Sequence, residues 1–172
     1  MALGTDYGGQ DCSLARALEL VGERWTPLIL RDAFVGVRRY RDFLDHLDIP
    51  RAVLAARLQA LVDAGVLAKE RYQDAPPRDE YVLTAKGREL WPALHLLGQW
   101  GERHLSDAGP RRVYTHLPCG SRLDGMGGCP SCGVVRPEDV EVRPGPGAVL
   151  TRTDAVSVAL RQPHRLLEPL RT

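Results

Sequence analysis

Apolar residues recur at helical spacing through the first third of the chain. Equivalent apolar stripes predict four helices, at residues 14–21, 27–35, 40–47 and 50–64. Thr26 is the expected N-cap of the second helix, because Pro27 suits the first helical position, where no backbone N–H is needed.

The pattern changes after Gly65. Residues 66–73 and 80–83 have the spacing of strands, and the Pro-rich turn between them predicts a stiff β-hairpin. A long helix is expected over residues 85–105, capped by Thr84 and bent at Pro92. Its apolar face is wider than a small core requires, so we expect it to pack against a second copy of the chain. The residues of that face are Trp91, Leu94, Leu97 and Trp100.

Four helices, a hairpin and a long closing helix are the elements of a winged helix-turn-helix. The predicted fold class is therefore α+β and mostly helical. In this fold the second helix of the helix-turn-helix enters the major groove of DNA, and the hairpin, or wing, reaches toward the neighbouring backbone.

Composition narrows the function without fixing it. The 172 residues are 44% hydrophobic and 26% charged, which excludes wholesale disorder. Neither a membrane span nor a signal peptide is evident, so we expect a cytoplasmic protein. The net charge of +1 gives no sign of a polyanionic partner, so a DNA-binding function must rest on local clusters of Arg.

Several motifs, in order, carry a family resemblance. Gly22-Glu-Arg-Trp25-Thr-Pro, Leu61-Val-Asp-Ala-Gly65 and Pro76-Pro-Arg-Asp-Glu-Tyr81 are among them. Over residues 12–101 the chain resembles the HxlR-type transcriptional regulators. The resemblance implies a homodimeric, sequence-specific DNA-binding protein, commonly a repressor, with no catalytic activity.

The resemblance also implies roles by position. Residues 50–64 would be the recognition helix, 74–78 the wing, and 10–21 with 85–105 the dimer interface. The family commonly places Ser or Thr beside the Pro that opens the recognition helix, whereas Arg51 and Ala52 follow Pro50 here. The candidate DNA-binding residues are Arg39, Arg41, Arg51, Arg57, Gln59 and Arg78.

A second signal begins at Arg111. His116-Leu-Pro-Cys119-Gly and Cys129-Pro-Ser-Cys132-Gly are two short ligand pairs, each followed by Gly, like the knuckles of a zinc ribbon. Four such ligands leave no open coordination position, so the predicted zinc is structural. Two alternatives stay open: His116 is a bystander, or no metal binds.

The sequence therefore divides into three parts. Residues 1–110 form the winged helix, 111–136 the zinc-ribbon-like segment, and 137–172 an extension of unknown role. The cysteines do not fit a zinc deaminase, since Pro118 stands where that motif has Glu and Gly128 where it has Pro. No other catalytic constellation is present, and we expect no enzyme.

Two features suggest how such a regulator responds to a signal. Cys12, at the head of the first helix, is a candidate thiol sensor, or alternatively a small interface residue. A small-molecule effector would need an apolar pocket. The candidate lining residues, which could instead be ordinary core aromatics, are Trp25, Phe34, Trp91 and Trp100. A different class also stays open, a protein-interaction module with no operator of its own.

Overall fold

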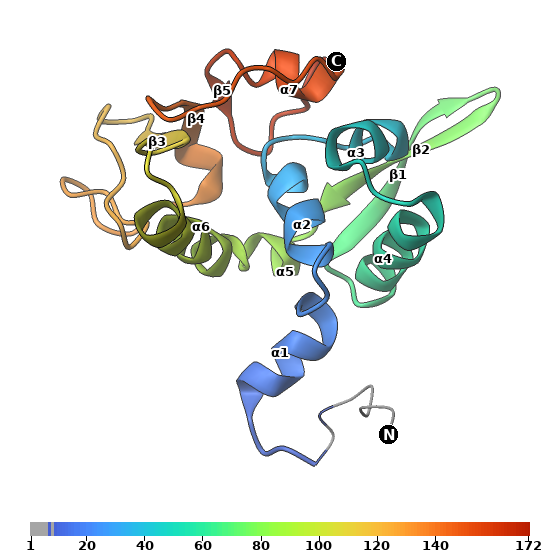
Figure 1. The fold of residues 1–172 in the computed structure, drawn as a ribbon. Coiled ribbons are helices and arrows are strands. Elements are labelled where there is room, and N and C mark those ends of the chain that lie inside the picture. The colour runs from blue at the N-terminus through green and yellow to red at the C-terminus, as the bar shows by residue number, and fades with distance from the viewer. Residues whose placement is uncertain (1–6, 8) are drawn as a thin grey trace.

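The computed structural model describes residue 7 and residues 9–172, so residues 1–6 and 8 of the predicted first domain lie outside the described part. The expected winged-helix elements are present in the expected order (Figure 1). The elements are α1 (Ser13–Val21), α2 (Thr26–Phe34), α3 (Tyr40–Leu47), α4 (Arg51–Asp63), β1 (Leu67–Asp74), β2 (Pro77–Leu83), α5 (Ala85–Arg88) and α6 (Trp91–Leu105).

The rest of the chain forms a small antiparallel sheet with the strand order β3-β4-β5. The strands are β3 (Arg112–His116), β4 (Val140–Pro144) and β5 (His164–Arg165). The same part of the chain contains the 3-10 helix η1 (Pro137–Asp139) and the helix α7 (Ala155–Ala159). The pairing of β3 with β4 joins residues from both sides of position 136. The cysteine-bearing loop therefore leaves this sheet and returns to it.

Two predicted details of the helices are wrong. Thr26 is the first residue of α2 and Trp25 is its N-cap, so the Thr26 side chain caps nothing and is buried instead. The predicted bend at Pro92 is a break between two helices, α5 and α6. Pro92 stands in the first turn of α6, where its missing N–H costs no hydrogen bond.

The hairpin turn is shorter than the sequence predicted. Pro77 already belongs to β2, where it pairs with Asp74 of β1. At the other end of the hairpin, Leu67 pairs with Leu83 and both side chains are buried. Thr84 caps α5 as predicted, because its hydroxyl accepts a hydrogen bond from the Gly87 N–H.

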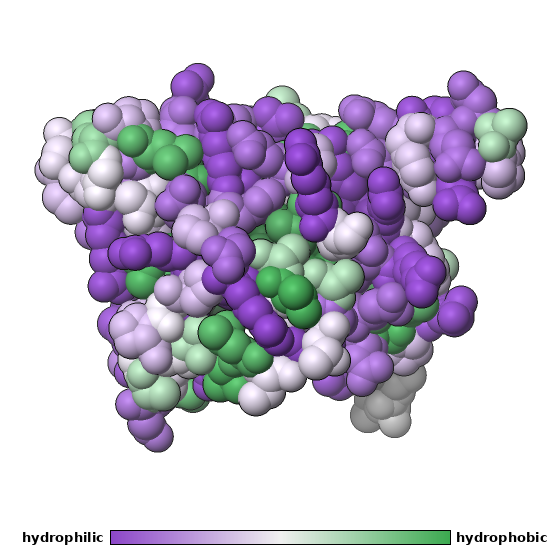
Figure 2. Space-filling model, turned by 90° about the horizontal axis from the view of Figure 1, so that it is seen from above, coloured by the Kyte–Doolittle hydropathy of each residue, from purple (hydrophilic) through white to green (hydrophobic). Residues whose placement is uncertain are grey.

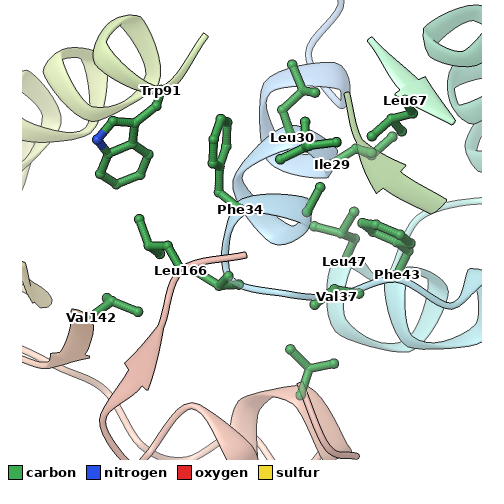
Figure 3. Close-up of a cluster of buried hydrophobic side chains, with 14 of the residues drawn as sticks. Ile29, Leu30, Phe34, Val37, Phe43, Leu47, Leu67, Trp91, Val142 and Leu166 are labelled. Atoms are coloured by element: carbon green, nitrogen blue, oxygen red, sulfur yellow. The ribbon is translucent and has the colours of Figure 1, made fainter. Parts of the chain in front are cut away.

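One continuous core joins the winged helix to the C-terminal sheet. Figure 3 shows Phe34 of α2 between two groups, with Ile29 and Leu30 on one side and Trp91 and Leu166 on the other. The Leu167 N–H donates to the Phe34 carbonyl over 2.8 Å. The C-terminal extension therefore completes the core of the winged helix.

Gly36 is required where this extension passes α2. Its φ is +89°, and a Cβ at this position would lie 1.8 Å from the Glu168 carbonyl oxygen. Any larger residue would therefore both strain the backbone and push the extension away.

Burial of Trp91 corrects one expectation about the dimer. Trp91 packs against Phe34 with 5.3 Å between ring centroids and is 6% exposed, so this chain alone buries it. Leu97 and Trp100 remain exposed on α6, and Leu14 and Leu18 on α1, which projects away from the body (Figure 1). No helix in the described part of the chain is long and apolar enough to cross a membrane.

Candidate DNA-binding surface and metal centre

Helix α4 presents a small, flat face to solvent. Leu54, Leu58 and Leu61 anchor its other face in the core. The Tyr40 hydroxyl donates to the Arg51 carbonyl over 2.9 Å and so fixes the start of α4 to α3. The exposed residues of α4 include Arg51, Ala52, Ala55, Ala56 and Gln59. This face lets the helix approach a groove closely, with few side chains available for hydrogen bonds.

Two of the six predicted DNA-binding residues are exposed and uncommitted. Arg51 opens α4, and Arg78 lies in β2 beside the wing tip. Within the described part of the chain neither guanidinium makes an ion pair. Both cations are therefore available to phosphate or to a base edge.

The other four are held by neighbouring side chains. The Arg57 guanidinium contacts the Glu23 carboxylate at 3.3 Å and is half-buried. Gln59 donates to Asp63 and accepts from Lys69. These contacts leave Arg57 and Gln59 less free to contact DNA than Arg51.

Arg41 and Arg39 lie on or beside α3. The Arg41 side chain is 3.5 Å from Asp45, one helical turn away, in an exposed pair that contributes little stability. Arg39 lies over the ring of Tyr72, with 5.0 Å between guanidinium carbon and ring centroid. Since Tyr72 belongs to β1, this cation–π contact links the helix-turn-helix to the wing.

Tyr40, Lys69 and Tyr72 also belong to this surface, and the sequence did not predict a role there for any of them. Contacts between different elements place each of these residues, whereas hydrophobic periodicity describes the spacing within one element. Lys69 also lies 5.8 Å from the ring centroid of Tyr81 on the facing strand. A strand-pairing prediction could have found that pair, because Lys69 and Tyr81 are directly opposite in the hairpin.

The four predicted metal ligands converge in space. One ligand atom from each of His116, Cys119, Cys129 and Cys132 lies within 4.8 Å of every other. The shortest separations are 3.3 Å from His116 Nδ1 to Cys119 Sγ and 3.4 Å between Cys119 Sγ and Cys129 Sγ. Ligand atoms on a tetrahedral zinc lie about 3.5 to 3.8 Å apart, so the donor set fits this ion.

The glycine after each ligand pair closes a tight turn, and its N–H bonds to a carbonyl oxygen. Gly120 and Gly133 directly follow Cys119 and Cys132, and their φ values are +71° and +80°. Each donates its N–H to the carbonyl of the first ligand of its pair, Gly120 to His116 and Gly133 to Cys129, both at 2.8 Å. Glycine is needed at these two positions because other residues rarely adopt this conformation.

The thiols of the cluster shift one another's pKa in opposite directions. Hydrogen bonds from the side chain and backbone of Ser121, and then from His116, lower the pKa of Cys119 to about 6. The hydrogen bond with Cys119, then burial and the other sulfur, raise the pKa of Cys132 to about 11. A divalent ion would relieve the repulsion that keeps these thiols from ionising together. When bound, it would cross-link the two knuckles.

The remaining predicted residues do not form one site. Phe34 and Trp91 touch each other, but Trp25 lies under Arg24, and Trp100 is 50% exposed beside His104. Cys12 is exposed and stands at the N-cap of α1, with no hydrogen bond from its side chain to the helix. Phe34 and Trp91 line one cavity together, and Trp25 and Trp100 are not among the residues of its wall.

The helix-turn-helix, its basic face and the wing define a DNA-binding regulator. Residues 20–108 match the HxlR-like helix-turn-helix family model. The uncharacterized HTH-type transcriptional regulator Rv3095 of Mycobacterium tuberculosis is 45% identical over 137 residues, covering 78% of this chain and 87% of the relative. The chain therefore belongs to the HxlR family of transcriptional regulators, which are not enzymes.

Solved structures agree with this assignment. The crystal structure of PA1607, described as a candidate transcription factor, is 34% identical, covers 84% of this chain and 92% of its own, and has a TM-score of 0.54. The redox regulator HypR in its reduced form is 27% identical with a TM-score of 0.52, covering 55% of this chain and 94% of its own. HypR thus matches over about half of this chain, and PA1607 over most of it.

Proposed function

We propose that this protein is a homodimeric, sequence-specific repressor that inserts α4 into the major groove of its operator. The observation that carries this proposal is the exposed start of α4, where Arg51 stands uncommitted beside a row of alanines. Arginine reads guanine through two parallel hydrogen bonds, and alanine can contact only the methyl group of thymine. Arg51 would therefore supply most of the hydrogen-bonded base recognition.

The wing supplies a second contact in this proposal. Arg78 extends from β2 near the hairpin tip, and Arg39 is oriented by the ring of Tyr72. Contacts of this kind go mainly to phosphates, which position a protein on DNA without selecting sequence. Loss of Arg78 should therefore weaken binding to all sequences alike.

A dimer interface formed by α1 and α6 is supported by their exposed apolar side chains. Leu14 is 66% exposed and Leu97 is 60% exposed, while Leu18 and Trp100 are also accessible. Large apolar patches of this kind are uncommon on monomeric proteins. A two-fold dimer would cover them and would place two copies of α4 on successive half-sites.

The Cys3His cluster would hold one structural zinc in each chain. Closed four-ligand sites of this type have no position for substrate. The metal would be needed for the loop between β3 and η1 to fold, since that loop has little apolar core of its own.

A response to a small molecule or to oxidants completes the proposal. Cys12 is exposed on α1 and would report oxidation directly at the proposed dimer interface. HypR, a redox regulator by name, has a similar fold and supports this part by analogy. Cys12→Ser should abolish any effect of diamide on DNA binding and leave binding under reducing conditions unchanged.

The DNA-binding function is tested by selection of duplexes from a random-sequence library, followed by titration at rising salt. We expect a recurrent palindromic site, and an affinity that falls steeply between about 50 and 200 mM salt as counterions are displaced. If no sequence is enriched and binding ignores salt, the alternative of a protein-interaction module is correct.

A further inference from the structure

A cavity of about 630 Å³ lies between the winged helix and the C-terminal sheet. Its walls come from α2, α3, α6, β3, β4, α7 and the segment that contains residues 148–150 and 152. Figure 2 looks down on the C-terminal side of the molecule, whose hydrophilic surface is interrupted by apolar patches. The sequence predicted a pocket between the core and the long helix, but none of the residues from the C-terminal segment was expected in it.

Most of the wall is apolar. Phe34 and Trp91 form an aromatic side, and Leu28, Leu94 and Val142 extend it. The volume is within the range of pockets for small organic ligands, which are typically apolar with a few polar groups that fix orientation. The ligand body must therefore be apolar.

Two cations in this wall, Arg111 and Arg112, make no ion pair among the described residues, and only Arg112 is withdrawn from solvent. Arg112 is half-buried, and its Nη1 donates to the Leu160 carbonyl over 2.9 Å. Within the described part of the chain it makes no ion pair with a carboxylate. Burial is the main cause that lowers the pKa of Arg112, but a guanidinium stays charged at neutral pH.

The neighbouring cation differs from Arg112 in this respect. Arg31 donates from Nε and Nη2 to Asp32, which is fully buried and also contacts His46 Nδ1 at 2.7 Å. Asp32 is thus already committed to two partners. Arg111 is exposed, and its backbone N–H donates to the Glu102 carboxylate, which also lines the cavity. Arg112 is left as the half-buried cation that an incoming anion would neutralise.

Two further polar groups in the wall lack partners. Trp91 and His95 are each more than nine-tenths buried. Trp91 Nε1 and both ring nitrogens of His95 have no hydrogen-bond partner. The backbone of Asp124 lies near His95 without reaching either nitrogen in hydrogen-bonding geometry. Because an indole N–H can only donate, Trp91 calls for an acceptor, and buried donors left unpaired are costly.

We propose that this cavity binds a small aromatic or aliphatic monocarboxylate, with its apolar body against Phe34 and Trp91 and its carboxylate on Arg112. A carboxylate is acceptor-only and pairs with a guanidinium through two parallel hydrogen bonds. The inference rests on the proposed response to a small molecule, and adds the site and the ligand class. A ligand here would touch both the winged helix and the C-terminal sheet.

The test compares two molecules of equal shape, 2-naphthoate and its neutral amide, 2-naphthamide. Calorimetric titration of the full chain at pH 7.5 should give at least about tenfold tighter binding of the carboxylate, since a charge-assisted pair is worth that much. Arg112→Met should remove this preference, and Arg136→Met, which alters an exposed Arg outside the cavity, should keep it. Equal affinity of the two molecules for the wild type, which needs no variant to fold, would overturn the proposal.

A second pair of variants tests the location. Gly98 lines the cavity and Gly101 does not, although both lie on α6 and an added Cβ meets nothing within 4 Å at either. Gly98→Leu should weaken 2-naphthoate binding at least about tenfold more than Gly101→Leu. Equal binding by both variants would place the ligand elsewhere.

DNA titrations of the same preparations keep the two proposals apart. Loss of the naphthoate preference with intact operator binding would refute only the cavity. Naphthoate binding by a protein that selects no DNA sequence would refute only the operator.

Discussion

The winged helix and the cysteine-bearing loop of this protein differ in how much apolar surface they bury. Residues 26–91 bury large side chains such as Ile29, Phe43 and Leu58 almost completely. Between residues 117 and 139 only Leu123 and Cys129 are buried among the apolar residues, and Val134 is 98% exposed. The first region can fold by removing apolar surface from water, whereas under the proposed function the second would need a metal on its four ligands.

The C-terminal extension follows the loop in the sequence, but its buried side chains pack in the core of the winged helix. Leu166 and Val142 enter the same core as Phe34 (Figure 3). Metal loss should therefore release the loop between β3 and η1 while the sheet stays docked.

The largest effect is expected from Phe34→Ala, because Phe34 packs against both the winged helix and the C-terminal half. Removal of a fully buried Phe typically costs about 3–5 kcal/mol. Urea denaturation should show this loss in a single transition reported by both halves. Trp100→Ala, at a half-exposed position, is the control and should cost far less.

Metal removal should act on one region only. Purified protein should contain about one zinc per chain, and Cys132→Ser should contain none, because three ligands bind it far more weakly than four. Hydrogen exchange should then become fast over residues 116–133 and stay unchanged in α2 and α4. Cys12→Ser should keep the metal. Fast exchange throughout the Cys132→Ser variant would show that the two regions do not have separate sources of stability.

Thr84→Ala tests a cap within the winged helix. The hydroxyl of Thr84 accepts from Gly87 N and donates to the Gly65 carbonyl, so it ties α5 to the turn before β1. Loss of such a cap costs about 1 kcal/mol. Thr151→Ala, at an exposed position, should leave the free energy of unfolding unchanged. A Thr84→Ala variant as stable as wild type would contradict the capping role.

The smallest expected effect is the change in the free energy of unfolding with pH that is due to His95 of α6. Burial lowers the pKa of His95 in the folded state below its ordinary value of 6.5. The unfolded chain therefore binds the proton more readily, and the free energy of unfolding should fall as pH drops below about 6.5. His95→Gln should remove this share of the pH dependence. Protonation of the metal ligands affects wild type and His95→Gln equally, so it cancels in the difference between them. Parallel plots of unfolding free energy against pH for the two proteins would contradict the expectation.

The sequence predicted the elements of the winged helix well because each has its own periodicity and end signals. The stripe of α4 and the ligand pairs at Cys119 and Cys132 are local patterns of this kind. The break before Trp91 was missed because Pro92 fits either a bend or a new helix start, and only packing decides. The burial of Trp91 was missed for the same reason, since its partner Tyr114 comes from β3.

Phe34 and Trp91 were expected in a pocket, but the rest of the cavity lining could not be predicted from the sequence. Its lining combines α2 with residues near Leu150, more than a hundred positions later, and no spacing rule connects such segments. The same holds for the contact of Arg39 with Tyr72, which joins α3 to the wing. Pairings between distant segments are properties of the folded chain.

The proposed recognition of bases by Arg51 of α4 can be measured directly. The affinities of wild type, Arg51→Ala and Arg136→Ala are compared on the selected duplex and on a shuffled duplex by fluorescence anisotropy. We expect Arg51→Ala to lose about 1–3 kcal/mol on the selected duplex and much of the discrimination against the shuffled one, while Arg136→Ala binds like wild type. Unchanged affinity and unchanged discrimination in Arg51→Ala would contradict the proposed role of Arg51 in base recognition.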